Sequence, residues 1–218
     1  MNVPVILVCK GFFGNASCLK NLRIGSHREI IPFITPLIMG NLTHLELNYS
    51  PSPPSPFPFE AVLRDGAHLE SLRIEEPSSF QTPSVHFRRY SHSLPQLKRF
   101  AISFSSPASA AEYDYDLFPT ICDFLRNKPG LVTLELVAPN NSKSQKLLGF
   151  GRECWNFLTA LDHLRCLSMT LTNLDDSEHY SQLIPRSVTS LTLLGLSLTL
   201  SDETRLEKVI SVVRAYRN

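Results

Sequence analysis

The sequence has little of the material from which phosphate, metal and catalytic sites are commonly built. It contains only nine glycines, and the phosphate-binding patterns G-x-x-x-x-G-K-[ST] and G-x-G-x-x-G are missing. The patterns H-E-x-x-H, G-x-S-x-G and C-x-x-C are missing as well. We therefore expect no cofactor, no metal ion and no enzymatic activity.

An excess of one charge and long apolar runs are also lacking. The 21 Lys and Arg residues nearly balance the 20 Asp and Glu residues, so no strong field favours nucleic acid or an anionic membrane. No segment approaches the ~18 apolar residues of a membrane span, and residues 1–8 lack the basic start of a signal peptide. The five cysteines are an odd number without metal-ligand spacing, which is typical of reduced thiols. We expect a cytoplasmic or nuclear protein that binds neither nucleic acid nor a membrane.

One short apolar phrase, L-x-x-L-x-L with conservative exchanges, recurs along the chain, and its first positions lie 23 to 34 residues apart. The seven copies are Leu19-Leu22-Ile24, Leu42-Leu45-Leu47, Leu69-Leu72-Ile74, Leu97-Phe100-Ile102, Leu131-Leu134-Leu136, Leu164-Leu167-Met169 and Val188-Leu191-Leu193. Because the last two apolar residues of each copy are two positions apart, each copy predicts a short strand with one buried face. Stacking of these strands predicts that Leu72, Leu134 and Leu167 lie in one continuous core.

Helix-like segments separate the expected strands. Residues 59–64 end before Gly66, and residues 118–126 end before Pro129-Gly130. Strands that alternate with short helices indicate a parallel sheet with the helices on the opposite face. The sequence thus predicts an α/β leucine-rich-repeat-like solenoid, a horseshoe with a parallel sheet on its concave face and helices and loops on its convex face. The alternative is an ordinary globular α/β domain whose strands resemble one another by chance.

We expect residues 1–218 to form a single domain of about seven irregular repeats. The five prolines of residues 50–58 predict an extended surface loop after the second strand. Residues 78–92 are long and polar for a connection between repeats, and we expect them to be only partly helical. Residues 201–218 carry an apolar stripe at helical spacing, which predicts a C-terminal capping helix.

Two stretches resemble the irregular leucine-rich repeats of F-box proteins, particularly those of the large fungal groups. They are residues 63–74, LRDGAHLESLRI, and residues 94–100, LPQLKRF. The resemblance implies a substrate receptor of a cullin-type ubiquitin ligase, in which an F-box docks the ligase adaptor and the repeats hold the target. Only residues 1–18 precede the first repeat, and Val8-Cys9-Lys10 is similar to the end of an F-box, so we expect the F-box to be missing or truncated. No asparagine stands eight residues after any leading leucine, in contrast to regular extracellular repeats.

Two small groups of reactive side chains are candidates for chemistry. Cys166 with His163 is one, because a neighbouring imidazole can activate a thiolate. The acidic segment 175–179 is superficially similar to a cation site, although it lacks the spacing and the glycine of a calcium loop. The spacing of Cys166 and His163 is common by chance, and the acidic segment is better explained as a solvent-exposed turn. A Cys-dependent hydrolase is therefore kept only as a distant alternative.

The strand face opposite the buried leucines is the candidate binding surface. Because successive side chains of a strand point to opposite faces, the residues of this surface can be chosen from the sequence. The candidate protein-binding residues are Arg23, His44, Glu46, Asn48, Arg73, Glu75, Arg99 and Glu135. We expect a mixed-charge N-terminal half, followed by a C-terminal half of mostly Ser and Thr. Replacing Arg73 and Arg99 by Glu is expected to abolish partner capture and to change stability by about 1 kcal/mol or less.

The sequence therefore favours a protein–protein interaction module that holds a protein target on its concave face. The resemblance implies that this module is the substrate-recognition part of an F-box-type ubiquitin ligase receptor, with the ligase adaptor as a second partner. A stand-alone leucine-rich-repeat scaffold or regulatory protein without ligase association is the alternative.

Overall fold

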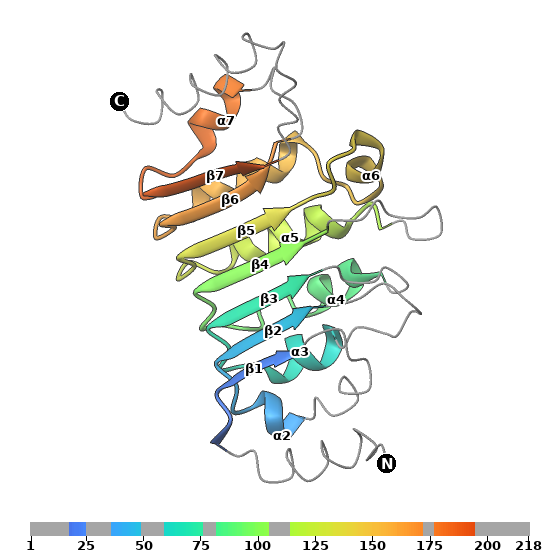
Figure 1. The fold of residues 1–218 in the computed structure, drawn as a ribbon, viewed down its shortest axis with the longest axis vertical. Coiled ribbons are helices and arrows are strands. Elements are labelled where there is room, and N and C mark those ends of the chain that lie inside the picture. The colour runs from blue at the N-terminus through green and yellow to red at the C-terminus, as the bar shows by residue number, and fades with distance from the viewer. Residues whose placement is uncertain are drawn as a thin grey trace, which may run out of the picture.

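The chain folds into an α/β structure built on one seven-stranded parallel sheet (Figure 1). The computed structural model describes residues 18–24, 36–48, 59–75, 82–104, 114–171 and 177–194. The strands are β1 (Asn21–Ile24), β2 (His44–Asn48), β3 (Ser71–Glu75), β4 (Arg99–Ser103), β5 (Thr133–Val137), β6 (Cys166–Thr170) and β7 (Ser190–Leu194). The helices are α2 (Pro36–Met39), α3 (Phe59–Asp65), α4 (Pro83–Arg89), α5 (Leu117–Arg126), α6 (Ser142–Leu147), the 3₁₀ helix η3 (Arg152–Ala160) and α7 (Ser177–Leu183). The strand order in the sheet follows the sequence, so each connection leads to the adjacent strand.

The seven apolar phrases of the sequence form the seven strands, and they are aligned in register. The second apolar position of each phrase forms the row Leu22, Leu45, Leu72, Phe100, Leu134, Leu167 and Leu191. The third position forms the row Ile24, Leu47, Ile74, Ile102, Leu136, Met169 and Leu193. Both rows contribute to one hydrophobic cluster, which includes Leu72, Leu134 and Leu167 as buried members. The predictions of matching parallel strands and of a shared core are therefore confirmed.

The chain enters the six strands β2 to β7 through the same kind of turn. The leading apolar residue of the phrase donates its backbone N–H to the carbonyl oxygen three residues earlier, as Leu69 does to Gly66 at 2.9 Å. The carbonyl oxygen of the residue before the strand then accepts two N–H groups from the next repeat. Glu70, for example, accepts from Lys98 at 2.8 Å and from Arg99 at 2.9 Å, and this arrangement recurs at all six neighbouring strand pairs. Because these hydrogen bonds recur from repeat to repeat, the repeats differ in length mainly in the return paths, the segments that lead from the end of one strand to the start of the next.

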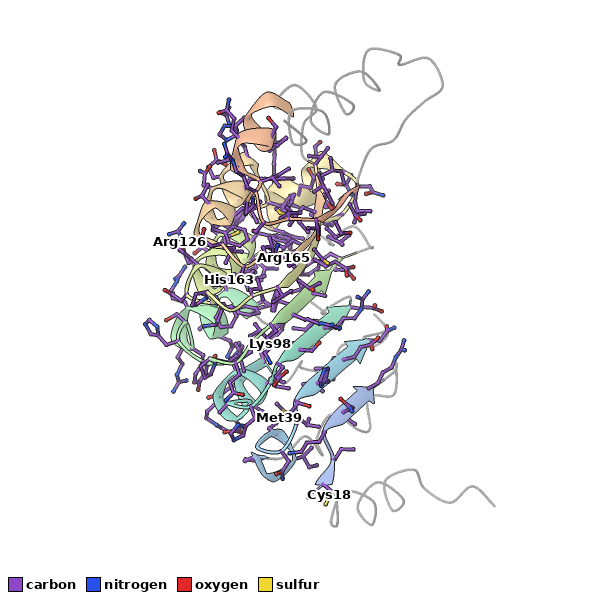
Figure 2. All side chains as sticks on the ribbon, turned by 90° about the vertical axis from the view of Figure 1, so that its left-hand side faces the viewer. Cys18, Met39, Lys98, Arg126, His163 and Arg165 are labelled. Atoms are coloured by element: carbon purple, nitrogen blue, oxygen red, sulfur yellow. The ribbon has the colours of Figure 1, made fainter. Side chains whose placement is uncertain are left out.

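The described helices α3, α4, α5 and η3 pack on one face of the sheet, as the side view shows (Figure 2). Aromatic side chains connect neighbouring repeats within this layer. The ring centre of Phe87 in α4 lies 5.6 Å from that of Phe59 in α3, 5.3 Å from that of Phe124 in α5 and 6.3 Å from that of Phe100 in β4. Edge-to-face contacts of this kind add to the energy of apolar burial. The core therefore runs without interruption from one repeat to the next.

The C-terminal part of the described chain is held by a second aromatic contact. Trp155 in η3 is fully buried, and its ring centre lies 4.4 Å from that of Tyr180 in α7. Phe157 and Leu158 of the same helix are also buried, so η3 packs an apolar face against the core. The expected connection over residues 78–92 contains α4. The expected loop over residues 50–58 and the expected capping helix over residues 201–218 lie outside the described residues.

None of the helices in the described ranges has the length and apolar character that crossing a lipid bilayer would need.

One lysine is buried in the turn between α5 and β5. Lys128 is only 2% exposed, and its ammonium group donates to the carbonyl oxygen of Ser91 at 3.0 Å. The same group lies 4.3 Å from the ring centre of Phe124, which is a favourable cation–π position. Burial disfavours the charged amine, and it lowers the pKa of Lys128 from 10.5 to about 8.

Replacing Lys128 by methionine is expected to flatten the rise of stability with pH. Between about pH 8 and pH 10.5, the unfolded chain still holds a proton on Lys128 that the folded chain has lost. The free energy of unfolding of the wild type should therefore rise across this window by up to roughly 1 kcal/mol per pH unit relative to Lys128→Met. Below pH 8 both states are protonated, and this difference in slope disappears. Urea unfolding of both proteins at several pH values measures the effect, and parallel pH profiles would contradict it.

Candidate functional site

The candidate binding residues lie on the sheet face turned away from the packed helices, which we call the open face. Its first row contains Asn21, His44, Ser71, Arg99, Thr133, Cys166 and Ser190. Its second row contains Arg23, Glu46, Arg73, Ala101, Glu135, Ser168 and Thr192. A third row contains Asn48, Glu75, Ser103 and Val137. All eight residues chosen from the sequence fall into these rows, so strand alternation placed them correctly.

Arg73 is the centre of a charge network on the open face. Its Nε donates to Oε1 of Glu75 at 2.7 Å, and its Nη1 donates to Oε2 of Glu135 at 3.0 Å. Glu135 belongs to β5, and β4 lies between it and Arg73, with Ala101 in the intervening position of the row. Because alanine has a short side chain, the arginine can extend over β4 to reach the second carboxylate. The hydrogen bond to Glu75, together with the charge of Glu135, raises the pKa of Arg73.

A second ion pair lies toward the N-terminal edge of the sheet. Nη2 of Arg23 is 3.2 Å from Oε1 of Glu46, and the Arg23 side chain is 72% exposed. An ion pair this accessible to solvent contributes little to stability. Next to it, Nδ1 of His44 is 2.9 Å from the hydroxyl oxygen of Thr43.

Arg99 differs from the other charged residues of the open face. Three arginines and three glutamates occupy this face, so its formal charges cancel. Arg23, Arg73 and all three glutamates take part in ion pairs within the sheet. Among the described residues, no ion pair includes the exposed Arg99 in the first row. Of these six charges, the guanidinium group of Arg99 is thus the one without a carboxylate partner in the part of the chain that the structure describes.

The C-terminal half of the open face is built mainly from hydroxyl side chains, as the sequence predicted. Thr133, Ser168, Ser190 and Thr192 are partly or fully exposed there. Thr170 at the end of β6 is a different case, because it is fully buried although it follows the same alternation from Ser168.

The buried Thr170 completes the backbone hydrogen bonds where β5 ends. Its hydroxyl oxygen accepts from the N–H of Ala138 at 3.0 Å, and the same hydroxyl donates to the carbonyl oxygen of Ala138 at 3.3 Å. A buried backbone group without a partner would be costly, and here a side chain supplies that partner. In regular repeats, an asparagine after the leucine phrase has this role. The sequence lacks that asparagine, and it gave no indication that Thr170 would bond to the backbone of Ala138 instead.

In the Cys166 and His163 candidate for thiol chemistry, Cys166 is the first residue of β6, and His163, labelled in Figure 2, lies just before that strand. Cys166 is half-buried, whereas His163 is exposed in the turn that precedes the strand. Within the described part of the chain, no hydrogen bond joins the two side chains. No group of three or more His, Cys, Asp or Glu residues in that part is placed to hold a metal ion. The acidic candidate segment 175–179 lies partly outside the described residues.

Neither protein-family models nor curated proteins provide a significant match to this sequence.

Proposed function

We propose that the chain is a leucine-rich-repeat-like solenoid that binds a protein partner through the open face of its sheet. The supporting observation is the constant strand entry, in which one carbonyl oxygen accepts two N–H groups of the next repeat at six successive strand pairs. Stacked units of one strand and one return path are the construction principle of solenoid proteins. In a horseshoe of this kind, the open face is the concave surface, which is the usual binding surface.

The chemistry of the open face suits a protein partner. Its charges cancel, and a nucleic-acid-binding surface would instead carry a basic excess. Arg99 is exposed between Ser71 and Thr133 in the first row, so a guanidinium and two hydroxyl groups are presented together. Arginine is enriched at the residues that dominate protein–protein binding energies. Arg99 is therefore the side chain that we expect to contribute most to binding.

We also propose that this binding serves substrate recognition for an F-box-type ubiquitin ligase. The support is the resemblance of residues 63–74 and 94–100, which run from the end of α3 through β3 and through the turn into β4. Cys122, Cys154 and Cys166 are free thiols, in keeping with a protein of the cytoplasm or nucleus. A solenoid scaffold without ligase association is the alternative, and it differs in lacking the adaptor as a partner.

An Arg99→Glu variant tests the binding surface. Charge reversal at this exposed position is expected to weaken target binding at least tenfold, because a favourable contact becomes repulsive, while stability changes by less than about 1 kcal/mol. The target is first identified by affinity purification and mass spectrometry, and its affinity for purified wild type and variant is then measured. Arg186→Glu is the matched control, because Arg186 is exposed in the turn before β7 and outside the open face.

Equal target affinity of Arg99→Glu and Arg186→Glu would contradict the assignment of the binding surface. The same purification separates the two proposed roles. A ligase adaptor that co-purifies with wild type and with both variants supports the ligase role, because Arg99 would not contact the adaptor. A target that is retained without any adaptor supports the stand-alone scaffold.

Arg73 is less suitable than Arg99 for this test. The sequence predicted that replacing both arginines by Glu would change stability by about 1 kcal/mol or less, but Arg73 holds Glu75 and Glu135 in place. A glutamate at position 73 would bring three carboxylates together and leave two of them without their cation. We therefore expect Arg73→Glu to reduce stability as well as binding, so that a loss of binding could not be assigned to the surface.

A further inference from the structure

Two buried cysteines meet where α5 packs against η3. Cys122 is 5% exposed and Cys154 is 3% exposed, and both are free thiols. The Cys122 sulfur lies 3.5 Å from the backbone carbonyl oxygen of Cys154. The side chain of Cys122 in α5 therefore contacts Cys154 in η3. The Cys154 sulfur lies 3.4 Å from the carbonyl oxygen of Gly149. Residues that are 32 positions apart in the sequence are thereby brought into one contact.

The two thiols differ in their chemical environment. A hydrogen bond from Cys122 stabilises the thiolate form of Cys154 and lowers its pKa. The same interaction, with the burial of Cys122, raises the pKa of the Cys122 thiol. A thiolate is the reactive form toward oxidants, and a second thiol beside it can resolve the oxidised product. The pair therefore combines an attacking sulfur with a resolving sulfur.

We propose that Cys122 and Cys154 form a redox-active dithiol, which hydrogen peroxide converts into a disulfide between α5 and η3. The proposal is independent of the binding function of the open face. It rests on the placement of both side chains in the same buried helix contact, from which the described cysteines Cys18 and Cys166 are absent.

The reaction balances without a metal or cofactor. The Cys154 thiolate attacks one oxygen of hydrogen peroxide, the O–O bond breaks, and the second oxygen leaves as water after taking up a proton. Cys154 is then a sulfenic acid. The Cys122 sulfur attacks the Cys154 sulfur, the S–S bond forms, and the S–O bond breaks with loss of a second water. In total, two thiols lose two electrons and two protons, and the peroxide is reduced to two waters.

The disulfide would connect the two ends of a segment that includes β5 and α6. A covalent link of this kind restricts the unfolded chain and holds α5 against η3. The pair would thus make the packing between these two helices dependent on the redox state of the protein's surroundings.

Peptide mapping of the oxidised protein tests the proposal. The full chain carrying Cys9→Ser, Cys18→Ser and Cys166→Ser is treated with hydrogen peroxide while folded, then unfolded, alkylated, digested and analysed by mass spectrometry. We expect most molecules to contain one linked peptide pair that joins Cys122 to Cys154 and separates again with a reductant. The wild-type chain should give the same linked pair, so the result does not depend on the three substitutions.

A Cys122→Ser variant adds the second readout. Without its resolving partner, Cys154 is expected to stop at the sulfenic acid, which dimedone traps, and the circular dichroism spectrum shows whether the variant is folded. Recovery of Cys122 and Cys154 as alkylated thiols after oxidation of the wild type would overturn the proposal. Sulfinic or sulfonic acid at either residue without a linked peptide would overturn it too.

Discussion

Replacing Leu134 by alanine is expected to lower the free energy of unfolding by about 2–5 kcal/mol. Leu134 is fully buried in β5, between Phe100 of β4 and Leu167 of β6 in the same apolar row. Removing its isobutyl end would leave a cavity that the flanking repeats can fill only in part. Equilibrium unfolding in urea, followed by circular dichroism, measures the loss.

The same exchange at the end of the row provides the matched control. Leu191 in β7 occupies the corresponding position but is only partly buried, so Leu191→Ala should cost less than Leu134→Ala. Leu72→Ala and Leu167→Ala should behave like Leu134→Ala, because both residues are buried in the interior of the row. Near-neutral stability in all three interior variants would refute a continuous core through the stacked strands.

Replacing Gly149 by alanine should be more damaging than the same exchange at Gly66, Gly130 or Gly151. Gly149 has a φ of 67°, in the left-handed region that costs other residues about 1–2 kcal/mol. A Cβ there would overlap the backbone carbonyl oxygen of Tyr115 and would lie 2.9 Å from Cδ of Pro119. The segments that crowd it lead into α5 and form its first turn, so little can move. We expect the overlap to add about 1–3 kcal/mol to the conformational cost.

Gly130→Ala is the control for this exchange. A Cβ at Gly130 would meet no atom within 4 Å, so we expect its stability to change by about 0.5 kcal/mol or less. Thermal unfolding of both variants compares the two positions directly. Equal unfolding midpoints would show that the connection between α6 and η3 rearranges without cost. The close approach of Tyr115 to Gly149 would then not restrict this position.

The sequence predicted which residues lie together on the open face, but it did not predict which of them contact one another. Alternation within each phrase correctly placed Arg73, Arg99 and Glu135 on one face, because adjacent residues of a strand must point in opposite directions. It did not indicate that Arg73 and Glu135 form a pair across Ala101. That contact depends on which strands are neighbours and on the size of the side chain between them.

Sequence reasoning also gave no sign of the contact between Cys122 and Cys154. The expected helix over residues 118–126 agrees well with α5, and the buried residues of η3 include Trp155, Phe157 and Leu158. Each helix could be identified separately, because its apolar stripe is a local property of the sequence. Which residues of two helices meet is decided by how the helices pack, and no local pattern carries that information.

Seven strands could be predicted from the amino-acid sequence alone, together with the apolar rows that they bury and the polar rows that they expose. Burial of apolar side chains follows a period of two along a strand, so it can be read from single phrases. Packing of the repeats places two glutamates beside Arg73, leaves Arg99 without an ion pair among the described residues, and turns Thr170 inward to the backbone of Ala138. Arg73 and Glu135 are 62 residues apart, and they meet because the return paths bring β3, β4 and β5 side by side. Distances of a few ångströms between such residues arise from packing, which involves the whole stack at once.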